Sequence, residues 1–138
     1  MEIAARTDGI LRPGVSRQTT GLGQIDAVVL SIVEPEHFTQ RLVKGEHYQL
    51  LQHTYNVGLI NRLEGYFYKD QFLSELRKLD SFYEAAFYVE NGEHIGATHD
   101  VFSQPGTVYL VHADRAVIAA DYRRVRALEL QGSYIGRR

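Results

Sequence analysis

Histidine side chains are the groups in this sequence best suited to bind a metal ion or to transfer a proton near neutral pH. The sequence has six of them, and His94, His99, Asp100 and His112 lie in a segment rich in strand-forming residues. Facing pairs on neighbouring strands could bring this set together, as a small hydrolase or lyase would require. However, His94 and His99 are five positions apart, so on one strand they point to opposite faces. We therefore expect ordinary strand and turn histidines, and no metal site.

Other sequence signatures of catalysis are absent. The chain contains no cysteine, which excludes disulfides, thiolate metal sites and cysteine nucleophiles. It also lacks the Gly-x-Ser-x-Gly elbow of many hydrolases, the His-Glu-x-x-His zinc motif and a phosphate-binding loop that ends in lysine. The sequence thus favours a protein without catalysis of its own and without a cofactor, and it identifies no catalytic residue.

Positive charge is concentrated towards the C-terminus. From Arg115 onward there are six arginines and two acids, a balance of +4, so the formal charge of −2 leaves −6 for the remaining residues. Arg123, Arg124 and Arg126 could contact an anionic partner, and Tyr122 beside them could stack on a nucleic-acid base. Nucleic-acid binding is therefore one alternative function. The sequence pI of about 6.3 argues against it, because dedicated nucleic-acid domains usually have a basic overall balance.

Aromatic residues give the leading functional hypothesis. The chain has nine tyrosines, six phenylalanines and no tryptophan. Tyr66, Phe67, Tyr68 and Tyr83 flank a predicted helix closely, and tyrosine is enriched at protein interfaces because it combines a large apolar area with a polar tip. We expect a regulatory, adaptor or inhibitor protein that binds another protein through this Tyr/Phe-rich surface and the Arg-rich surface. The expected partner includes a second copy of the chain, as in a homodimer.

Length and composition limit the architecture. At 138 residues, 44% hydrophobic and 23% charged, the chain matches one ordinary globular domain. No apolar run approaches the length of a membrane span, and the first residues do not resemble a signal peptide. We therefore expect a soluble, cytoplasmic protein that does not contact a membrane.

The first half of the chain predicts an arm, a strand and helices. Residues 1–24 are rich in glycine and polar residues without periodicity, which predicts a flexible N-terminal arm before a single domain over 25–138. Residues 25–33 form a nearly continuous apolar run, which is typical of a strand buried on both faces. A short helix is expected over 35–44. Apolar residues on both faces of 47–64 predict the central helix of the domain.

The second half predicts one more helix and then strands. Apolar spacing over 70–80 indicates a third helix, while Asn91-Gly92 is a strong hairpin signal. Strands are expected over 84–90, 93–102, 107–112 and 116–120, which together form an antiparallel meander. For 116–130 a helix capped by Asp114 is the alternative, and residues after 121 fit either structure. Helices segregated from most strands predict an α+β fold.

Overall fold

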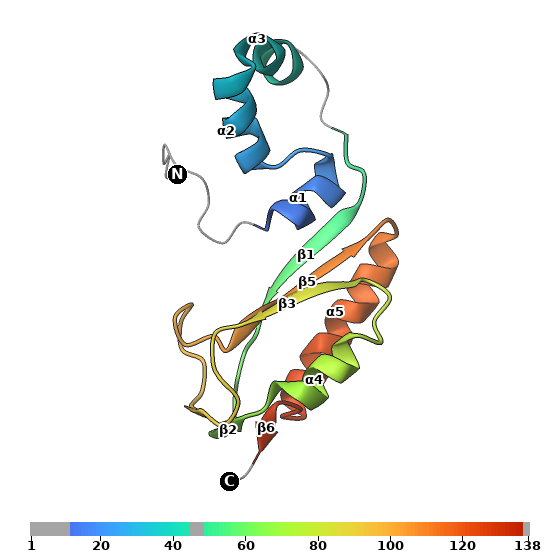
Figure 1. The fold of residues 1–138 in the computed structure, drawn as a ribbon. Coiled ribbons are helices and arrows are strands. Elements are labelled where there is room, and N and C mark those ends of the chain that lie inside the picture. Colours follow the sequence, from blue (N-terminus) through green and yellow to red (C-terminus); the bar gives the residue numbers. More distant parts are fainter. Residues whose placement is uncertain (1–11, 45–48, 137–138) are drawn as a thin grey trace. The chain divides into compact units, whose positions relative to one another are not determined.

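The computed structural model describes residues 12–44 and 49–136, and the chain divides into two compact units, residues 1–52 and 53–138 (Figure 1). We describe each unit separately. The division at 52/53 differs from the predicted boundary, which placed an arm over 1–24 and one domain over 25–138. Residues 1–11 of the predicted arm lie outside the described residues, and 13–20 form a helix.

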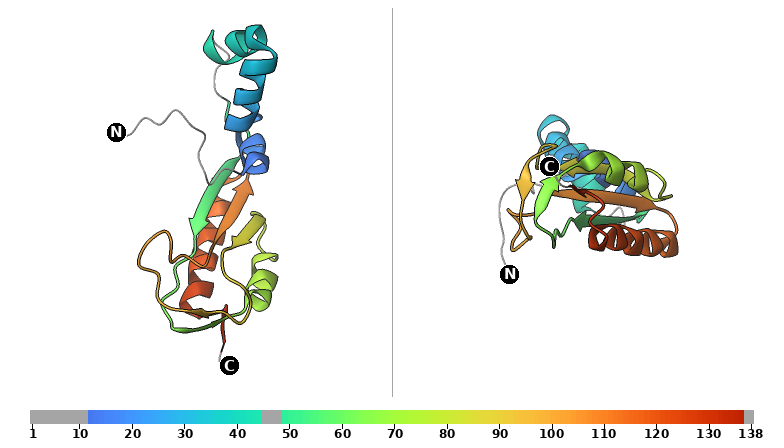
Figure 2. Two further views of the ribbon diagram at one scale, coloured as in Figure 1. Left: turned by 60° about the vertical axis from the view of Figure 1, so that its left-hand side comes forward. Right: turned by 90° about the horizontal axis from the view of Figure 1, so that it is seen from below.

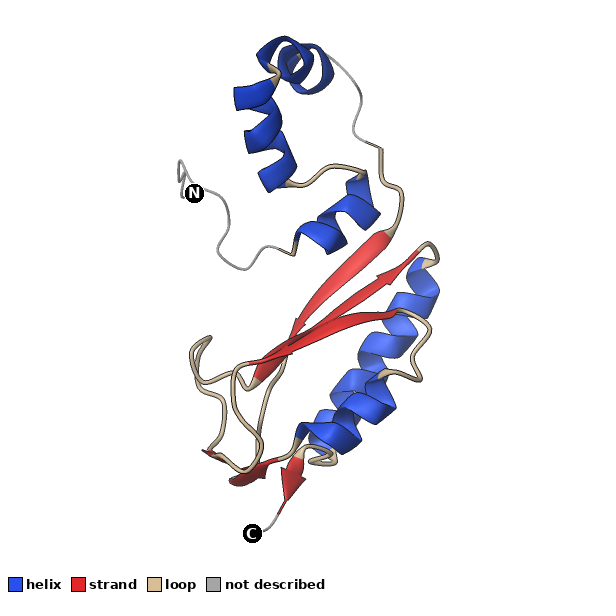
Figure 3. Ribbon diagram, in the orientation of Figure 1, coloured by secondary structure: helices blue, strands red, loops and turns tan. Residues whose placement is uncertain are grey.

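All the secondary-structure elements in the described part of the first unit are helices (Figure 3). It contains α1 (Pro13–Thr20), α2 (Gln24–Val33), α3 (Pro35–Phe38) and the π-helical turn η1 (Thr39–Val43). Proline begins α1 and α3, where its missing N–H costs nothing. Gly21 ends α1 with a φ of 76°, a conformation that favours glycine. The helix expected over 35–44 is thus present, divided into two pieces.

The predicted buried strand over 25–33 is wrong, because these residues form α2. The carboxylate of Asp26 accepts a hydrogen bond from the Gly23 backbone N–H at 2.9 Å and also pairs with Arg17, so it caps α2 and joins it to α1. A continuous apolar run cannot by itself distinguish a strand from a helix. Positions 25, 28, 29, 32 and 33 follow helical spacing, and the prediction gave more weight to β-branched composition.

The second unit is built on a three-stranded antiparallel sheet with two helices packed on it. The strand order is β1 (His53–Gly58), β5 (Gly106–His112) and β3 (Phe82–Phe87). The long helix α5 (Arg115–Leu130) packs against β1 and β5, and α4 (Lys69–Leu76) packs against β3 (Figure 2). A smaller antiparallel sheet has the order β4 (His94–Ile95), β2 (Gly65–Phe67) and β6 (Ile135–Gly136). This mixture of helices and antiparallel sheets agrees with the α+β class.

The core of the second unit lies between the larger sheet and the two helices. Phe72 of α4 and Ile118 of α5 are fully buried, as are Val108 and Leu110 of β5. Aromatic rings extend the core towards the smaller sheet, where the Tyr134 ring lies 5.0 Å from that of Phe72 and 5.8 Å from that of Phe67. Burying these side chains removes apolar area from water, which stabilises the fold of this unit.

The predicted central helix over 47–64 is also wrong. Residues 47 and 48 lie outside the described residues, 53–58 form β1, and the segment from 59 to 64 is irregular. In β1 the more buried side chains alternate with exposed ones, so that Tyr55 and Val57 face inward while Thr54 and Asn56 face out. Tyr55, Val57 and Leu59 are two apart and fit a strand, although the same segment also satisfies a helical pattern.

The predicted C-terminal meander does not form either. The helix expected over 70–80 is present but ends at Leu76, and strands are present at 82–87 and 106–112. The strand expected over 93–102 is reduced to β4, which joins the other sheet, while β3 pairs with β5. Residues 116–120 belong to α5, whose N-cap Asp114 accepts a hydrogen bond from the Ala116 backbone N–H at 2.7 Å. The helical alternative for this segment was therefore the correct one. Side-chain capping explains it, because Asp114 satisfies an N–H that the helix itself leaves unpaired.

Candidate binding surfaces

The first candidate surface is an apolar stripe along α2. Its members are spaced as residues on one face of a helix, and their exposed fractions run from 42% to 75%; they are Ile25, Val28, Val29, Ile32 and Val33, which we call the α2 stripe. None of the residues of α2 is buried. Five large aliphatic side chains together on one helix face are an exposed hydrophobic patch, which in a globular protein marks a contact surface.

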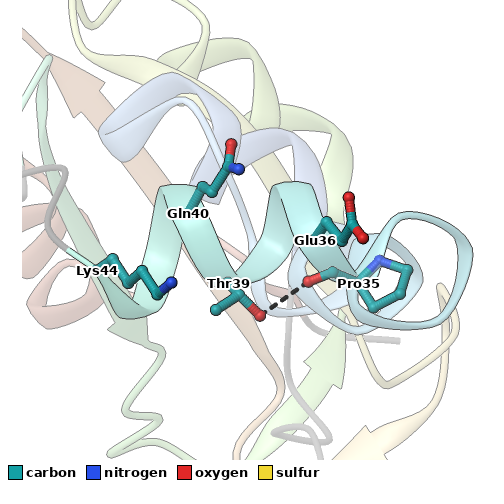
Figure 4. A pocket seen from close by; sticks show the side chains of 5 residues that line it. All are labelled: Pro35, Glu36, Thr39, Gln40 and Lys44. Carbon is teal, nitrogen blue, oxygen red and sulfur yellow. Dashed lines mark hydrogen bonds between the residues drawn. The ribbon is translucent and has the colours of Figure 1, made fainter.

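The first unit exposes two further apolar side chains on η1. Leu42 and Val43 of η1 are 45% and 66% exposed. Beside them is a shallow hollow lined by Pro35, Glu36, Thr39, Gln40 and Lys44, shown in Figure 4. These residues all come from α3, η1 and the residue that follows, and the Thr39 hydroxyl is already used in a 2.8 Å hydrogen bond to the Pro35 carbonyl. The hollow is therefore a shallow depression on a helical surface, and its lining residues do not form a catalytic arrangement.

The three arginines predicted to contact a partner, Arg123, Arg124 and Arg126, differ in their surroundings. Arg126 donates hydrogen bonds to the Glu129 carboxylate at 2.8 and 2.9 Å and to the Gly58 carbonyl at 3.1 Å. Arg124 lies 3.6 Å from Glu75, which also pairs with Lys78 and whose pKa is lowered chiefly by the Lys78 hydrogen bond. Arg123 is exposed. Of the three arginines expected to contact a partner, Arg126 has a structural role and Arg124 has an acidic neighbour.

The Arg126–Glu129 pair connects α5 to the end of β1. The Glu129 side chain is 4% exposed and accepts a hydrogen bond from the Ile60 backbone N–H at 2.8 Å. Burial raises the pKa of this carboxyl, although the Ile60 and Arg126 hydrogen bonds oppose the rise. The buried Tyr134 hydroxyl donates to the Ile60 carbonyl at 3.2 Å, and burial raises its pKa as well. These groups connect α5 and the segment after it to the residues that follow β1.

The aromatic residues predicted to form a contact surface also differ in exposure: some are buried in the core and others are exposed. Phe67 is fully buried in the core, and Tyr66 is half-buried with its ring 5.4 Å from that of His94. Tyr122 lies between Tyr55, at 5.8 Å between ring centroids, and the Arg126 guanidinium at 5.1 Å. Tyr68 and Tyr83, by contrast, are each 40% exposed. Of the aromatic residues considered for binding, these two present the most surface.

The three histidines considered for catalysis, His94, His99 and His112, lie in different parts of the second unit. His94 lies in the smaller sheet 3.4 Å from Glu64, His99 is in the loop after β4, and His112 ends β5 in the larger sheet. His112 is directly opposite His53 of β1, a pairing that the sequence did not predict because residue 53 was assigned to a helix. Within the described ranges 12–44 and 49–136, no three His, Asp or Glu side chains are arranged to hold a metal ion.

The longest helix in the described part of the chain, α5, has 16 residues. None of the helices described there combines the length and apolar character needed to cross a bilayer.

Known proteins offer a structural likeness only. No protein-family model matches the sequence, and no curated protein matches it. The structure is similar to that of an L-amino acid ligase from Bacillus licheniformis, with a TM-score of 0.62 and 16% sequence identity over 83% of this chain. The chain spans 28% of the length of that ligase. At this identity the likeness shows a shared fold and no shared activity.

The α2 stripe is the surface that sequence reasoning missed. The signal was present, because apolar residues at 25, 28, 29, 32 and 33 follow the i, i+3, i+4, i+7, i+8 pattern of one helix face. Assigning this segment to a buried strand placed the same side chains in the core. The prediction therefore looked for contact residues among tyrosines and arginines, several of which are structural.

Proposed function

We propose that this chain acts by binding another protein, and that the α2 stripe is its main contact surface. The observation that carries the proposal is that five aliphatic side chains, 42–75% exposed, occupy one face of a helix with no buried residue. Covering apolar surface is the main favourable contribution to most protein–protein associations. The exposed Tyr68, Tyr83 and Arg123 of the second unit are secondary contacts in this proposal.

The comparison with the ligase supports a partner of a particular kind. There, a region with this fold forms 28% of a longer enzyme chain. In the ligase this fold is one part of a larger protein. An exposed apolar face such as the α2 stripe is consistent with the same fold packing against another protein part here. We propose an amino acid ligase or a related enzyme body, on a separate chain, as the partner.

Two other functions have less support. The hydrolase or lyase alternative needed His94, His99, Asp100 and His112 together, but His94 and His112 belong to different sheets. The nucleic-acid alternative needed Arg123, Arg124 and Arg126 as one anionic contact site, and two of the three already have acidic neighbours. Protein binding therefore explains more of the exposed surface.

The test compares a stripe variant with a matched control. The stripe variant carries Val29→Glu and Ile32→Glu; the control carries Gln24→Glu and Gln40→Glu, the same number of new charges at exposed positions of the same unit. Tagged wild-type chain and control should retain one enzyme from the native extract in equal amounts, and the stripe variant should lose it. Equal retention by all three, or retention of nothing by the wild-type chain, would contradict the proposal. Sedimentation velocity of the purified chain shows whether a second copy is the partner instead.

A further inference from the structure

The turn after β3 contains a chemically labile pair of residues, Asn91-Gly92. Both residues are exposed, and a Cβ added at Gly92 would meet no atom beyond its chain neighbours within 4 Å, so nothing crowds the glycine backbone. Asparagine is among the less chemically stable residues of proteins. When glycine follows it, the glycine nitrogen can approach the asparagine amide carbon without hindrance from a side chain. This pair is therefore a candidate site of spontaneous modification.

The reaction available to this pair is deamidation, in which water is the only co-reactant. The Gly92 nitrogen forms a bond to Cγ of Asn91, and its proton passes through solvent to the side-chain nitrogen, which leaves as ammonia. Water then breaks one of the two C–N bonds of the resulting succinimide ring. Breaking the bond to Cγ gives aspartate. Breaking the bond to the main-chain carbonyl carbon gives isoaspartate, in which the main chain runs through the former side chain.

In the folded chain both reacting groups are held by hydrogen bonds. The Gly92 N–H donates to the Phe67 carbonyl at 2.7 Å. The side-chain oxygen of Asn91 accepts from the Lys69 backbone N–H at 3.0 Å, and its NH₂ group donates to the Asp70 carboxylate at 3.3 Å. Ring closure needs a Gly92 nitrogen that is released to solvent and an Asn91 side chain that turns towards it. The reaction therefore requires local opening of the turn.

The same hydrogen bonds give Asn91 a structural role at the start of α4. Tyr68, the N-cap residue of this helix, makes no capping hydrogen bond with its side chain. Lys69 is the first residue of α4, and its N–H is one of the donors that a helix leaves unpaired. Asn91, 22 positions later in the sequence, supplies the acceptor. We call the two hydrogen bonds from Asn91 to Lys69 and Asp70 the α4 clasp.

We propose that Asn91 is a deamidation site whose rate is set by opening of the α4 clasp, and that its isoaspartyl product releases the turn from α4. In the aspartyl product the main chain is unchanged; the new carboxylate still faces Lys69 but meets the like charge of Asp70. In the isoaspartyl product the main chain gains one carbon and the side chain loses one, which displaces the acceptor of the Lys69 N–H. This inference concerns the second unit and is independent of the α2 stripe.

The first experiment measures deamidation of the purified full chain near neutral pH by peptide mass mapping, with and without denaturing urea. Asn56 and Asn61 are internal controls, because the side chains of Val57 and Arg62 hinder attack. Asn91 should react before the controls in both conditions, and at least about tenfold more slowly in the folded chain than in urea. Equal rates with and without urea, faster reaction at a control, or no product at Asn91 in the folded chain would overturn the proposal.

A variant of the clasp tests whether its opening sets the rate. Asp70→Ala removes the acceptor of the Asn91 NH₂ group, while Asp80→Ala makes the same change at an exposed position beyond the other end of α4. Asp70→Ala should speed deamidation of Asn91 in the folded chain about twofold to tenfold, as the loss of one hydrogen bond predicts, and leave the rate in urea unchanged. Asp80→Ala should alter neither rate. Equal rates in the two folded variants would overturn the proposal.

Hydrogen exchange tests the release of the turn. Isoaspartyl chain, isolated from the aged folded protein and verified by peptide mapping, should exchange the Lys69 amide at least about fivefold faster than unmodified chain, because that amide loses its acceptor. Asn91→Asp is the matched control, since it adds the same charge without altering the main chain, and it should change this exchange by less than about twofold. Equal exchange in isoaspartyl and unmodified chain would overturn the proposal, because the clasp would have survived the reaction.

Discussion

Helices α2 and α5 both carry apolar residues at helical spacing, but they differ in where those residues lie. In α5, Ile118, Val125 and Leu128 are buried against the sheet, whereas α2 has no buried residue and its apolar stripe is exposed. The comparison teaches that periodicity reveals an apolar face without revealing what covers it. In α5 the cover is the chain's own sheet, and for α2 we propose that it is another protein.

The largest expected effect compares the same substitution in the two helices. Ile118→Ala removes a fully buried side chain from α5 and should lower the free energy of unfolding of the second unit by about 2–5 kcal/mol. Ile32→Ala removes a side chain that is 75% exposed and should change stability by less than about 0.5 kcal/mol in the isolated chain. Denaturant unfolding followed by circular dichroism measures both. Similar losses in the two variants would mean that α2 is buried in the free chain.

The next effect compares the arginine–carboxylate pairs of the two units. Arg126→Met leaves the Glu129 carboxylate buried without its partner and should destabilise the second unit by about 2–4 kcal/mol. Arg17→Met removes the cation that pairs with Asp26. The Arg17 side chain is 58% exposed, so water screens its charge and the loss of stability should be much smaller. The same unfolding experiment tests this contrast. A larger loss for Arg17→Met would reverse our ranking of the two pairs.

The smallest effect is the response of each pair to acid. The Arg17 hydrogen bond lowers the pKa of Asp26 from 3.8 to about 2, so the stability from this carboxylate is complete above pH 4 and is lost as the pH falls towards 2. Burial instead raises the pKa of Glu129, because the ionised carboxylate is less favourable in the folded protein than in water. Protonation of Glu129 as the pH falls through that raised value therefore does not destabilise the second unit. NMR chemical shifts of Ala27 and Ile60 during an acid titration follow the two sites. In Asp26→Asn the transition at Ala27 between pH 4 and 2 should disappear; if it persists, another group causes it.

The elements that the sequence predicts well are those whose signals are local. The stripe of Phe72 and Leu76 identifies α4, and Asn91-Gly92 marks a turn after β3, where Gly92 has a φ of 85°, although the hairpin expected around this turn does not form. The Asp114 cap indicated the helix α5, but the prediction preferred strands over 116–120. Each depends on a few neighbouring residues. Pairing partners depend on residues far away in the sequence, and no local signal indicated that β3 pairs with β5 while β4 pairs with β2.

The candidate site was harder to predict, for a related reason. Phe67 and Arg126 have the residue types of a contact surface, yet Phe67 is in the core and Arg126 pairs with the buried Glu129. Exposure distinguishes these roles, and exposure depends on tertiary packing. The same applies to residues 25–33, whose composition suggested a core strand although their side chains are exposed. Residue type alone could not separate a structural aromatic or cation from one that meets a partner.

The most direct test of the account measures the solvent accessibility of two isoleucine methyl groups, using relaxation by a soluble gadolinium chelate. We expect Ile32 of α2 to be strongly broadened in dilute purified chain and protected in the complex isolated from native extract, while Ile118 of α5 is protected in both. Protection of Ile32 in the dilute chain would contradict an exposed stripe. Continued broadening of Ile32 in the complex would contradict its role as the contact surface.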